Sequence, residues 1–291
     1  MRLGNICPIC NSRKTKLILH ALNGHADKVF DTKTKFQYDR CQNCGGIFLI
    51  KKRKNKKYYE SFYSEEYRNA DKSSIDRLGN IIVALSDYQK IQLINKSIQK
   101  TKKIIQLLDV GSGFGRFLKK LDTDQFDAFG LEIDKDLITE SRDQGLTIFD
   151  GDFFNIDFGK KKFDCITLWH VIEHIDNPKA LLEKINKLLS KEGIVVFSTP
   201  NTDSIGFQKG KEYWFHLDAP RHQILYNRQS LTSLAEKFGF EVLEIKNNFY
   251  EFPTDIFYSL KHISQKKRYY VMYPYYKYTS RETMTYVWKK I

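Results

Sequence analysis

The stretch that decides the fold is QLLDVGSGFGRFLKK, residues 106–120, which is followed after a short polar gap by FDAFGLEID, residues 126–134. In the first part, an apolar strand ends at Asp109 and runs into a glycine-rich turn, after which apolar residues recur at helical spacing over 114–121. In the second part, a strand ends at Glu132. Glycines let a backbone approach a ligand closely, and an acid in this position accepts hydrogen bonds from ribose hydroxyls. The stretch therefore predicts a β-α-β nucleotide site.

The spacing of the glycines distinguishes between nucleotides. Dinucleotide-binding loops follow the pattern G-x-G-x-x-G. Here Gly115 comes one residue early, and Arg116 holds the position of the third glycine. The block resembles motif I of class I S-adenosylmethionine (SAM) methyltransferases, which implies SAM as the cofactor. An ordinary strand-to-helix turn is the alternative for a lone glycine loop. The cofactor-binding residues implied by this block are Asp109, Gly111, Gly113 and Glu132.

The next block along the chain is Asp150-Gly151-Asp152-Phe153, which follows a predicted strand over 147–149. In the family that it resembles, an acid here meets the adenine amino group, which implies a cofactor-binding role for Asp152. The neighbouring Phe153 would stack on the adenine ring or donate its backbone N–H to it. A polar turn is the alternative for this short block taken alone.

The segment FDCITLWHVIEHIDNP, residues 163–178, supplies a third block. Its first six residues are mostly apolar, which is typical of a strand buried on both faces of a parallel sheet. Trp169, His170 and His174 follow at the carboxyl end, where open α/β sheets bind ligands. An Asn-Pro pair then predicts the start of a helix. The segment resembles motif IV of small-molecule methyltransferases, and Trp169 joins the implied cofactor-binding residues.

The remaining elements complete the same fold. Three further strands are predicted over 193–198, 240–245 and 282–290, the last of them antiparallel. A helix is predicted over 231–238. The blocks occur in the order that the resembling family requires. The resemblance covers residues 103–291, and it implies an α/β fold with a Rossmann-like, seven-stranded class I methyltransferase sheet.

Four of the five cysteines form two C-x-x-C pairs that indicate a metal site. Paired knuckles of thiolates can close a tetrahedral Zn²⁺ site. The span between the pairs contains LILHAL and FQYDR, which can form strands. We therefore predict a structural zinc ion in a small, zinc-ribbon-like module. A redox role for one pair is the alternative, but it would not explain the second pair. The predicted ligands are Cys7, Cys10, Cys41 and Cys44.

Length and composition agree with this organisation. A chain of 291 residues with 41% hydrophobic content can hold one large domain and one small one. The predicted boundaries are a zinc-binding module over 1–57, a helical connector over 58–102 and a SAM-dependent methyltransferase domain over 103–291. No apolar run approaches the ~20 residues that span a bilayer, and the N-terminus lacks a signal-peptide core. We expect a cytoplasmic protein that can form a homodimer.

The formal net charge of +13 raises the question of a nucleic-acid partner. Most of the positive charge comes from lysines that are spread along the whole chain. Arginine is the preferred group for bidentate recognition of phosphates and bases. The expected partner is therefore a small-molecule or glycan acceptor rather than a nucleic acid.

Histidines gather in the segments expected at the carboxyl edge of the sheet. Imidazole is suited to removing a proton from an acceptor near neutral pH. His222, His170 and His174 are the candidate catalytic residues, with His222 as the general base. The segment KEYWFHLDAPRHQILY, residues 211–226, lies where the acceptor pocket is expected. Its candidate substrate-binding residues are Tyr213, Trp214, His216 and Arg221, the last of which would hold an acidic group of the acceptor.

The same segment resembles methyltransferases of bacterial surface-polysaccharide and modified-sugar pathways. One branch, the deoxysugar C-methyltransferases, also carries an N-terminal zinc module and uses a Glu-His pair whose histidine matches His222. Here Arg221 precedes that histidine in place of Glu. We therefore expect O-methylation of a sugar or a surface-glycan precursor, with sugar C-methylation as an alternative.

Two further classes stand as alternatives. A zinc-module RNA methyltransferase would share the architecture, but motif IV reads Trp169-His170-Val171 rather than the Asn/Asp-Pro-Pro-aromatic signature of exocyclic amine methylation. A non-catalytic binding protein is disfavoured because the acids and glycines of the cofactor blocks are intact. The Tyr- and Phe-rich insertion over 247–279 predicts a lid, a dimer surface, a glycan contact or an aromatic packing layer.

Overall fold

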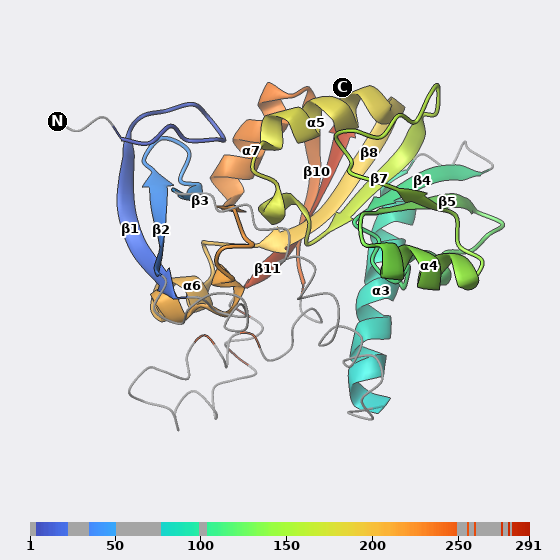
Figure 1. The fold of residues 1–291 in the computed structure, drawn as a ribbon, viewed down its shortest axis with the longest axis horizontal. Helices are drawn as coiled ribbons and strands as arrows, with labels where there is room; N and C mark the ends of the chain where they lie inside the picture. Colours follow the sequence, from blue (N-terminus) through green and yellow to red (C-terminus); the bar gives the residue numbers. More distant parts are fainter. Residues whose placement is uncertain are drawn as a thin grey trace.

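The computed structural model describes residues 4–22, 35–50, 77–98, 104–248, 255, 259, 275, 279 and 281–291. These residues form two sheets and the helices that cover them (Figure 1). Most of the insertion over 247–279 and the first half of the predicted helical connector lie outside the described residues.

The larger sheet has seven strands in the order β10-β11-β8-β7-β4-β5-β6. Strand β11 runs antiparallel to both of its neighbours, and the other described pairs are parallel. The predicted class I methyltransferase sheet is therefore confirmed, including its antiparallel last strand. The strands are β4 (Ile105–Val110), β5 (Phe126–Glu132), β6 (Ile148–Asp150), β7 (Phe163–Trp169), β8 (Leu189–Pro200), β10 (Phe240–Asn247) and β11 (Thr283–Lys290).

Helices cover both faces of this sheet (Figure 1). Leucines of α5 (Pro178–Leu188) and α7 (Arg228–Lys237) pack into one core with Val195 and Phe197. On the other face, Leu93 and Ile94 of α3 (Arg77–Ser97) pack with Leu107. The described part of the chain also contains α4 (Lys135–Asp143) and the short α6 (Ile205–Gly210). Strand β4, the origin of the glycine loop, thus lies inside a covered sheet, between β7 and β5.

The helix predicted directly after the glycine loop is wrong as an α-helix. The structure has turns followed by a short 3-10 helix, Leu118–Lys120. Gly115 has φ +67°, which an α-helix cannot accommodate, and a Cβ at this position would lie 2.1 Å from Leu146 Cδ1. The third glycine therefore serves a tight backbone turn against α4 and its following loop.

The smaller sheet has the order β1-β2-β3-β9. Its first strands are β1 (Thr15–Leu22), β2 (Lys35–Cys41) and β3 (Ile47–Leu49), which confirms that LILHAL and FQYDR form strands. The fourth strand, β9 (Ile224–Leu225), comes from the acceptor segment far along the chain and pairs antiparallel with β3. The N-terminal sheet and the predicted acceptor segment therefore form one hydrogen-bonded unit.

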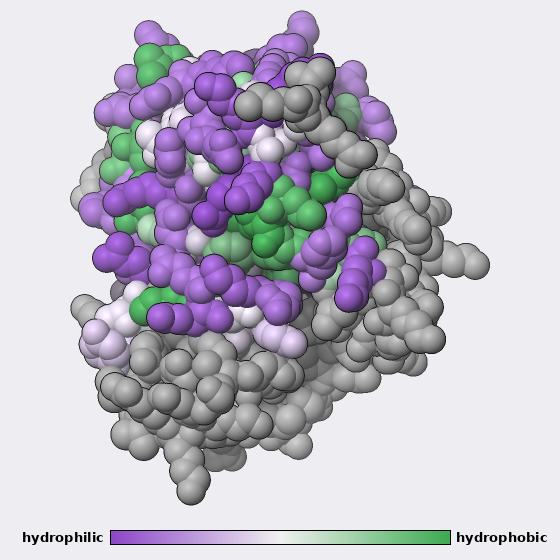
Figure 2. Space-filling view, turned by 90° about the vertical axis from the view of Figure 1, so that its left-hand side faces the viewer, coloured by the Kyte–Doolittle hydropathy of each residue, from purple (hydrophilic) through white to green (hydrophobic). Residues whose placement is uncertain are grey.

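Figure 2 shows the face of the molecule that carries this N-terminal sheet, with a group of apolar side chains framed by polar ones. Leu17 and Ile18 of β1 are exposed and line a shallow pocket together with the buried Phe207. Among the helices in the described part of the chain, none has both the length and the hydropathy needed to cross a membrane.

Candidate functional site

The carboxyl ends of β4 and β7 are joined by a buried side-chain hydrogen bond. The Thr167 hydroxyl donates to Asp109 Oδ1 at 2.7 Å. Burial raises the pKa of Asp109 to about 7, against the opposing effects of the Thr167 hydrogen bond and of Lys90. Gly111 is packed against the next segment as well, because a Cβ on it would lie 2.8 Å from Val171 Cγ2. The glycine loop and the end of β7 are therefore in direct contact.

Glu132 lies at the end of β5 and closes the glycine loop. Its Oε2 accepts a hydrogen bond from the backbone N–H of Gly113 at 2.9 Å, and its Oε1 accepts from the N–H of Ile133 at 2.7 Å. Gly113 has φ +53°, and nothing lies within 4 Å of the position that its Cβ would take. The loop thus leaves open space beside an ionisable acid, which is the arrangement that a ribose-binding site needs.

Of the two residues predicted to bind the cofactor after β6, Asp152 is exposed and Phe153 is buried. Asp152 is exposed, and its carboxylate accepts from the backbone N–H of Phe154 at 2.7 Å. The Phe153 ring is buried, with Lys184 Nζ 5.4 Å from its centroid. The Phe153 ring is therefore part of the core, packed away from solvent. Phe154, which sequence reasoning did not single out, has the exposed ring of this block.

Trp169 at the end of β7 is held between the glycine segment and α3. Its ring meets Phe117 edge to face, with centroids 5.1 Å apart, and Lys90 Nζ lies 4.5 Å from its centroid. A second link to α3 joins Arg116 Nε to Asp87 Oδ2 at 3.3 Å. Sequence reasoning assigned no role to the α3 residues, because only the folded chain brings α3 next to motif I.

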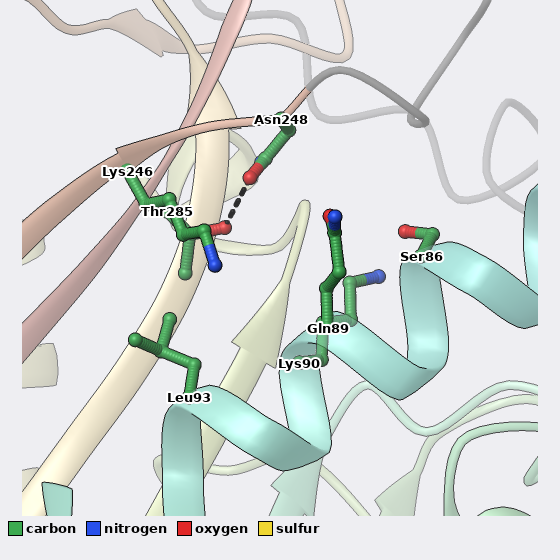
Figure 3. Close-up of a pocket in the computed structure, with 7 residues that line it drawn as sticks. All are labelled: Ser86, Gln89, Lys90, Leu93, Lys246, Asn248 and Thr285. Atoms are coloured by element: carbon green, nitrogen blue, oxygen red, sulfur yellow. Dashed lines mark hydrogen bonds between the residues drawn. The ribbon is translucent and has the colours of Figure 1, made fainter. Parts of the chain in front are cut away.

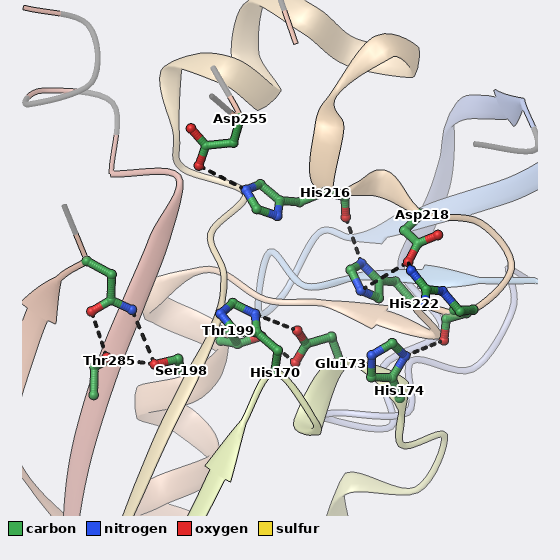
Figure 4. A network of polar contacts seen from close by, with 12 residues as sticks. His170, Glu173, His174, Ser198, Thr199, His216, Asp218, His222, Asp255 and Thr285 are labelled. Atoms are coloured by element: carbon green, nitrogen blue, oxygen red, sulfur yellow. Dashed lines mark hydrogen bonds and ion pairs between the residues drawn. The ribbon is translucent and has the colours of Figure 1, made fainter. Parts of the chain in front are cut away.

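His170 and Glu173 form a pair directly after β7 (Figure 4). His170 Nδ1 lies 3.1 Å from Glu173 Oε1, and the Thr199 hydroxyl donates to Glu173 Oε2 at 3.1 Å. Glu173 is fully buried. Burial acts to raise its pKa, but the hydrogen bond and charge of His170, with the other nearby histidines, outweigh this and lower the pKa to about 2. An ionised carboxylate only accepts, so Nδ1 of His170 carries a proton, and in the neutral imidazole the lone pair lies on Nε2.

The backbone at His170 is strained, since its φ is +56°. Non-glycine residues with positive φ cost free energy and cluster at functional sites. The turn keeps 20% of the His170 side chain exposed, against 9% for His222. His170 is therefore the more accessible of these two candidate catalytic residues.

His174 and His222 lie together on the far side of Glu173 (Figure 4). Their rings meet edge to face, with centroids 4.8 Å apart. Burial lowers the pKa of His222 to about 3, although the Asp218 carboxylate opposes this effect. Burial also lowers the pKa of His174. Both imidazoles are therefore neutral near neutral pH.

The predicted acceptor-binding residues occupy different environments. Tyr213 is exposed, whereas Trp214 is buried and its indole N–H donates to Glu282 Oε2 at 2.7 Å. His216 is also buried, and its Nε2 lies 3.2 Å from Asp255 Oδ2. Trp214 and His216 therefore lie in the core, each beside a buried carboxylate.

The guanidinium of Arg221 pairs with the carboxylate of Asp218 three residues earlier. Both side chains are largely buried, and Asp218 also lies 3.7 Å from His222 Nε2. The ion pair neutralises the charge that was predicted to hold an acidic group of the acceptor. Arg221 is placed to order the loop before His222.

A small pocket opens between α3 and the edge formed by β10 and β11 (Figure 3). Its volume of about 10 Å³ matches roughly one water molecule, so it does not hold an acceptor. The Thr285 hydroxyl donates to Asn248 Oδ1 at 2.7 Å beside it. The lining residues are Ser86, Gln89, Lys90, Leu93, Lys246, Asn248 and Thr285.

The four cysteines of the two knuckles come together at one end of the N-terminal sheet. Their sulfurs all lie within 4.8 Å of one another, with Cys7 and Cys44 Sγ 3.7 Å apart and Cys10 and Cys41 Sγ 3.5 Å apart. Zn–S bonds of about 2.3 Å in a tetrahedron place sulfurs about 3.8 Å apart. The cluster therefore fits a zinc ion, and it fits a redox disulfide poorly because all four sulfurs converge.

Comparison with protein families decides the relationship of the chain. A model described as a methyltransferase domain matches residues 84–245, which is more than half of the chain. The chain belongs to the methyltransferase domain family. The matched range contains the glycine loop, Glu132 and the His170–Glu173 pair, so the motif I and motif IV blocks lie inside the family's own domain.

The curated relatives come from Methanocaldococcus jannaschii. The uncharacterized protein MJ0638 is 26% identical over 150 residues, which cover 52% of this chain and 62% of the relative. The uncharacterized protein MJ1123 is 25% identical over 97 residues, which cover 33% of this chain and 45% of the relative. The chain thus matches less than two thirds of the length of either relative.

Solved structures share the fold at low sequence identity. The plantazolicin methyltransferase BamL, in complex with a triazolic desmethylPZN analog and SAH, is 17% identical, with a TM-score of 0.50 over 80% of this chain and 91% of that chain. The 4+2 cyclase SpnF is also 17% identical, with a TM-score of 0.50 over 69% of this chain and 80% of that chain. Because one of these structures is a cyclase, the acceptor chemistry must be argued from the site itself.

Proposed function

We propose that this protein transfers a methyl group from SAM to a hydroxyl of a small polar acceptor, most simply a sugar or a surface-glycan precursor. The observation that carries this proposal is the His170–Glu173 pair, which lies at the carboxyl end of β7, where the neighbouring Val171 packs against Gly111 of the glycine loop. A histidine oriented by a buried carboxylate is a suitable general base beside a methyl donor. Family membership and the intact motif I support SAM as that donor.

The donor site is proposed from the residues around the glycine loop. Glu132 would accept hydrogen bonds from the ribose hydroxyls, and the open side of Gly113 would lie against the cofactor. Asp152 is exposed after β6, where it would reach the adenine amino group. SAM supplies an electrophilic methyl group on a sulfonium, so the protein must position an acceptor in line with it.

Removal of the acceptor proton is the task proposed for His170. The hydroxyl proton would pass to His170 Nε2 as the acceptor oxygen bonds to the methyl carbon. Glu173 keeps Nδ1 protonated and stabilises the imidazolium that results, while Thr199 and the backbone hold Glu173 in place. His222 and His174, the other predicted catalytic residues, would line the same pocket on the far side of Glu173.

A structural zinc ion at the four cysteines is part of the proposal. The ion would hold the second cysteine pair, which lies where β2 ends and before β3 begins. Strand β3 pairs with β9, which directly follows His222 in the chain. Zinc would thereby hold the acceptor segment as well as the N-terminal module.

SAM binding is the first testable consequence. Calorimetry should show SAM or its demethylated product binding at micromolar strength, and Glu132→Gln should weaken binding by about 1–3 kcal/mol because a charged acceptor is lost. Glu140→Gln is the matched control, since this exposed acid lies on α4, the helix that follows β5. An analogue without ribose hydroxyls should bind both Glu132 forms alike. A full effect of the mutation on that analogue would contradict the ribose assignment.

The acceptor class is tested by a screen with labelled SAM across nucleotide sugars, glycans and ribosomal RNA. Label should enter the sugar-containing acceptors and resist mild acid as an O-methyl group. Transfer to RNA alone would replace this proposal with the RNA methyltransferase, and a methyl on carbon would replace it with sugar C-methylation.

A further inference from the structure

Glu173, His174 and His222 form a compact cluster of metal-ligating groups at the edge of the sheet. One donor atom from each side chain lies within 4.8 Å of the other two. Figure 4 shows Glu173 between His170 on one side and this histidine pair on the other. We propose that Glu173, His174 and His222 bind a divalent transition-metal ion at this edge of the sheet.

The hydrogen bonds behind the two rings fix which nitrogen each ring presents. His174 Nδ1 lies 3.2 Å from the carbonyl oxygen of Arg221, and His222 Nδ1 lies 2.7 Å from the carbonyl oxygen of His216. A carbonyl oxygen only accepts, so both Nδ1 atoms carry a proton and both Nε2 atoms carry a lone pair. Metal-binding histidines are held in this way, with one ring N–H donated to a carbonyl or carboxylate behind them.

The donor set defines the class of ion. Two neutral imidazoles and one carboxylate are the protein ligands of catalytic zinc sites and of mononuclear iron(II) sites, which keep further positions open. Metal–nitrogen bonds of about 2.0–2.1 Å place ligand atoms roughly 3.4 Å apart in a tetrahedron. The three ligand atoms lie within 4.8 Å of one another, so they would approach by at most about 1.4 Å to reach that spacing, while the Thr199 hydroxyl holds Glu173.

The cluster is chemically distinct from the four cysteines. Thiolates form a closed structural site, whereas nitrogen and oxygen donors with open positions form a site that can bind a substrate oxygen. A divalent ion there would lower the pKa of an acceptor hydroxyl bound to it. That use of the ion rests on the proposed methyl transfer to oxygen, whereas binding of the ion does not.

The experiment uses the full-length protein with its cysteine site occupied by zinc. Calorimetric titration with cobalt(II) should show one further ion bound per chain, with the visible absorbance of cobalt bound by nitrogen and oxygen. His174→Gln and His222→Gln should each weaken this binding on the order of 100-fold or more. His20→Gln, which changes an exposed histidine on β1, should bind cobalt as the wild type does.

Absence of further cobalt binding in the wild type would overturn the site, as would wild-type binding in both variants. SAM affinity and the melting temperature show whether each variant is folded. The titration of the wild type tests the metal site even if neither variant folds. Methylation assays separate the two proposals. Methyl transfer without cobalt binding would reject the metal site alone. Cobalt binding in a protein that methylates no hydroxyl would reject the proposed function and retain the site.

Discussion

Cys41→Ser protein should contain one zinc ion fewer per chain than the wild type, and its N-terminal sheet should be unfolded. Structural zinc in small modules contributes an apparent free energy of about 10–16 kcal/mol, which is more than most domains have as net stability. Loss of one sulfur from a cluster with sulfur separations of 3.5 and 3.7 Å removes most of that contribution. Metal analysis and hydrogen exchange of the β2 and β3 amides measure the two effects.

The same change should reach the acceptor segment but spare the cofactor site. The Tyr38 hydroxyl donates to the carbonyl oxygen of His222 at 2.7 Å, and the Leu49 N–H donates to the carbonyl oxygen of Gln223 at 2.9 Å. Unfolding of the N-terminal sheet would break both bonds, so amide exchange in β9 should rise while SAM affinity stays within about twofold. Cys165→Ala is the control, because this cysteine is buried in β7 outside the cluster. A zinc-free protein with a fully protected N-terminal sheet would refute the zinc assignment.

His170→Ala should lower turnover by about 10²–10⁴-fold once an acceptor is in hand, since general-base assistance is worth that order in rate. This corresponds to roughly 3–5 kcal/mol of activation free energy. SAM affinity should stay within about twofold, because the donor-site residues around Glu132 are unchanged. Steady-state kinetics and calorimetry on the same preparation measure both quantities.

Two comparison variants make this result specific. Glu173→Gln keeps a hydrogen-bond acceptor beside His170 but removes the charge, so turnover should fall while folding and SAM binding persist. The exposed His20 on β1 provides a matched control, and His20→Ala should turn over normally. Near-normal turnover in His170→Ala, together with a large loss in His222→Ala, would move the general base to His222.

The sequence by itself determined the methyltransferase fold and the loop and acid that we propose as the donor site. The apolar run ending at Asp109, the glycine spacing and Glu132 predicted β4, the loop and β5, because backbone turns and buried strands depend on local residue types. The Asn-Pro pair likewise predicted the start of α5, where the Asn177 side chain caps the N–H of Ala180. The two C-x-x-C pairs predicted a four-sulfur cluster, since knuckle spacing is also a local property.

Only the tertiary structure decided which histidines work together and what supports them. Glu173 received no role from the sequence, yet its carboxylate bonds to His170 and lies within 4.8 Å of the ligand atoms of His174 and His222. Strand β9 was missed because two residues carry no periodicity, and its pairing with β3 depends on contacts far apart in the chain. The Phe153 ring and Trp214, which the sequence predicted as ligand contacts, are buried in the core. Long-range packing sets the orientation of each side chain, and no local pattern encodes it.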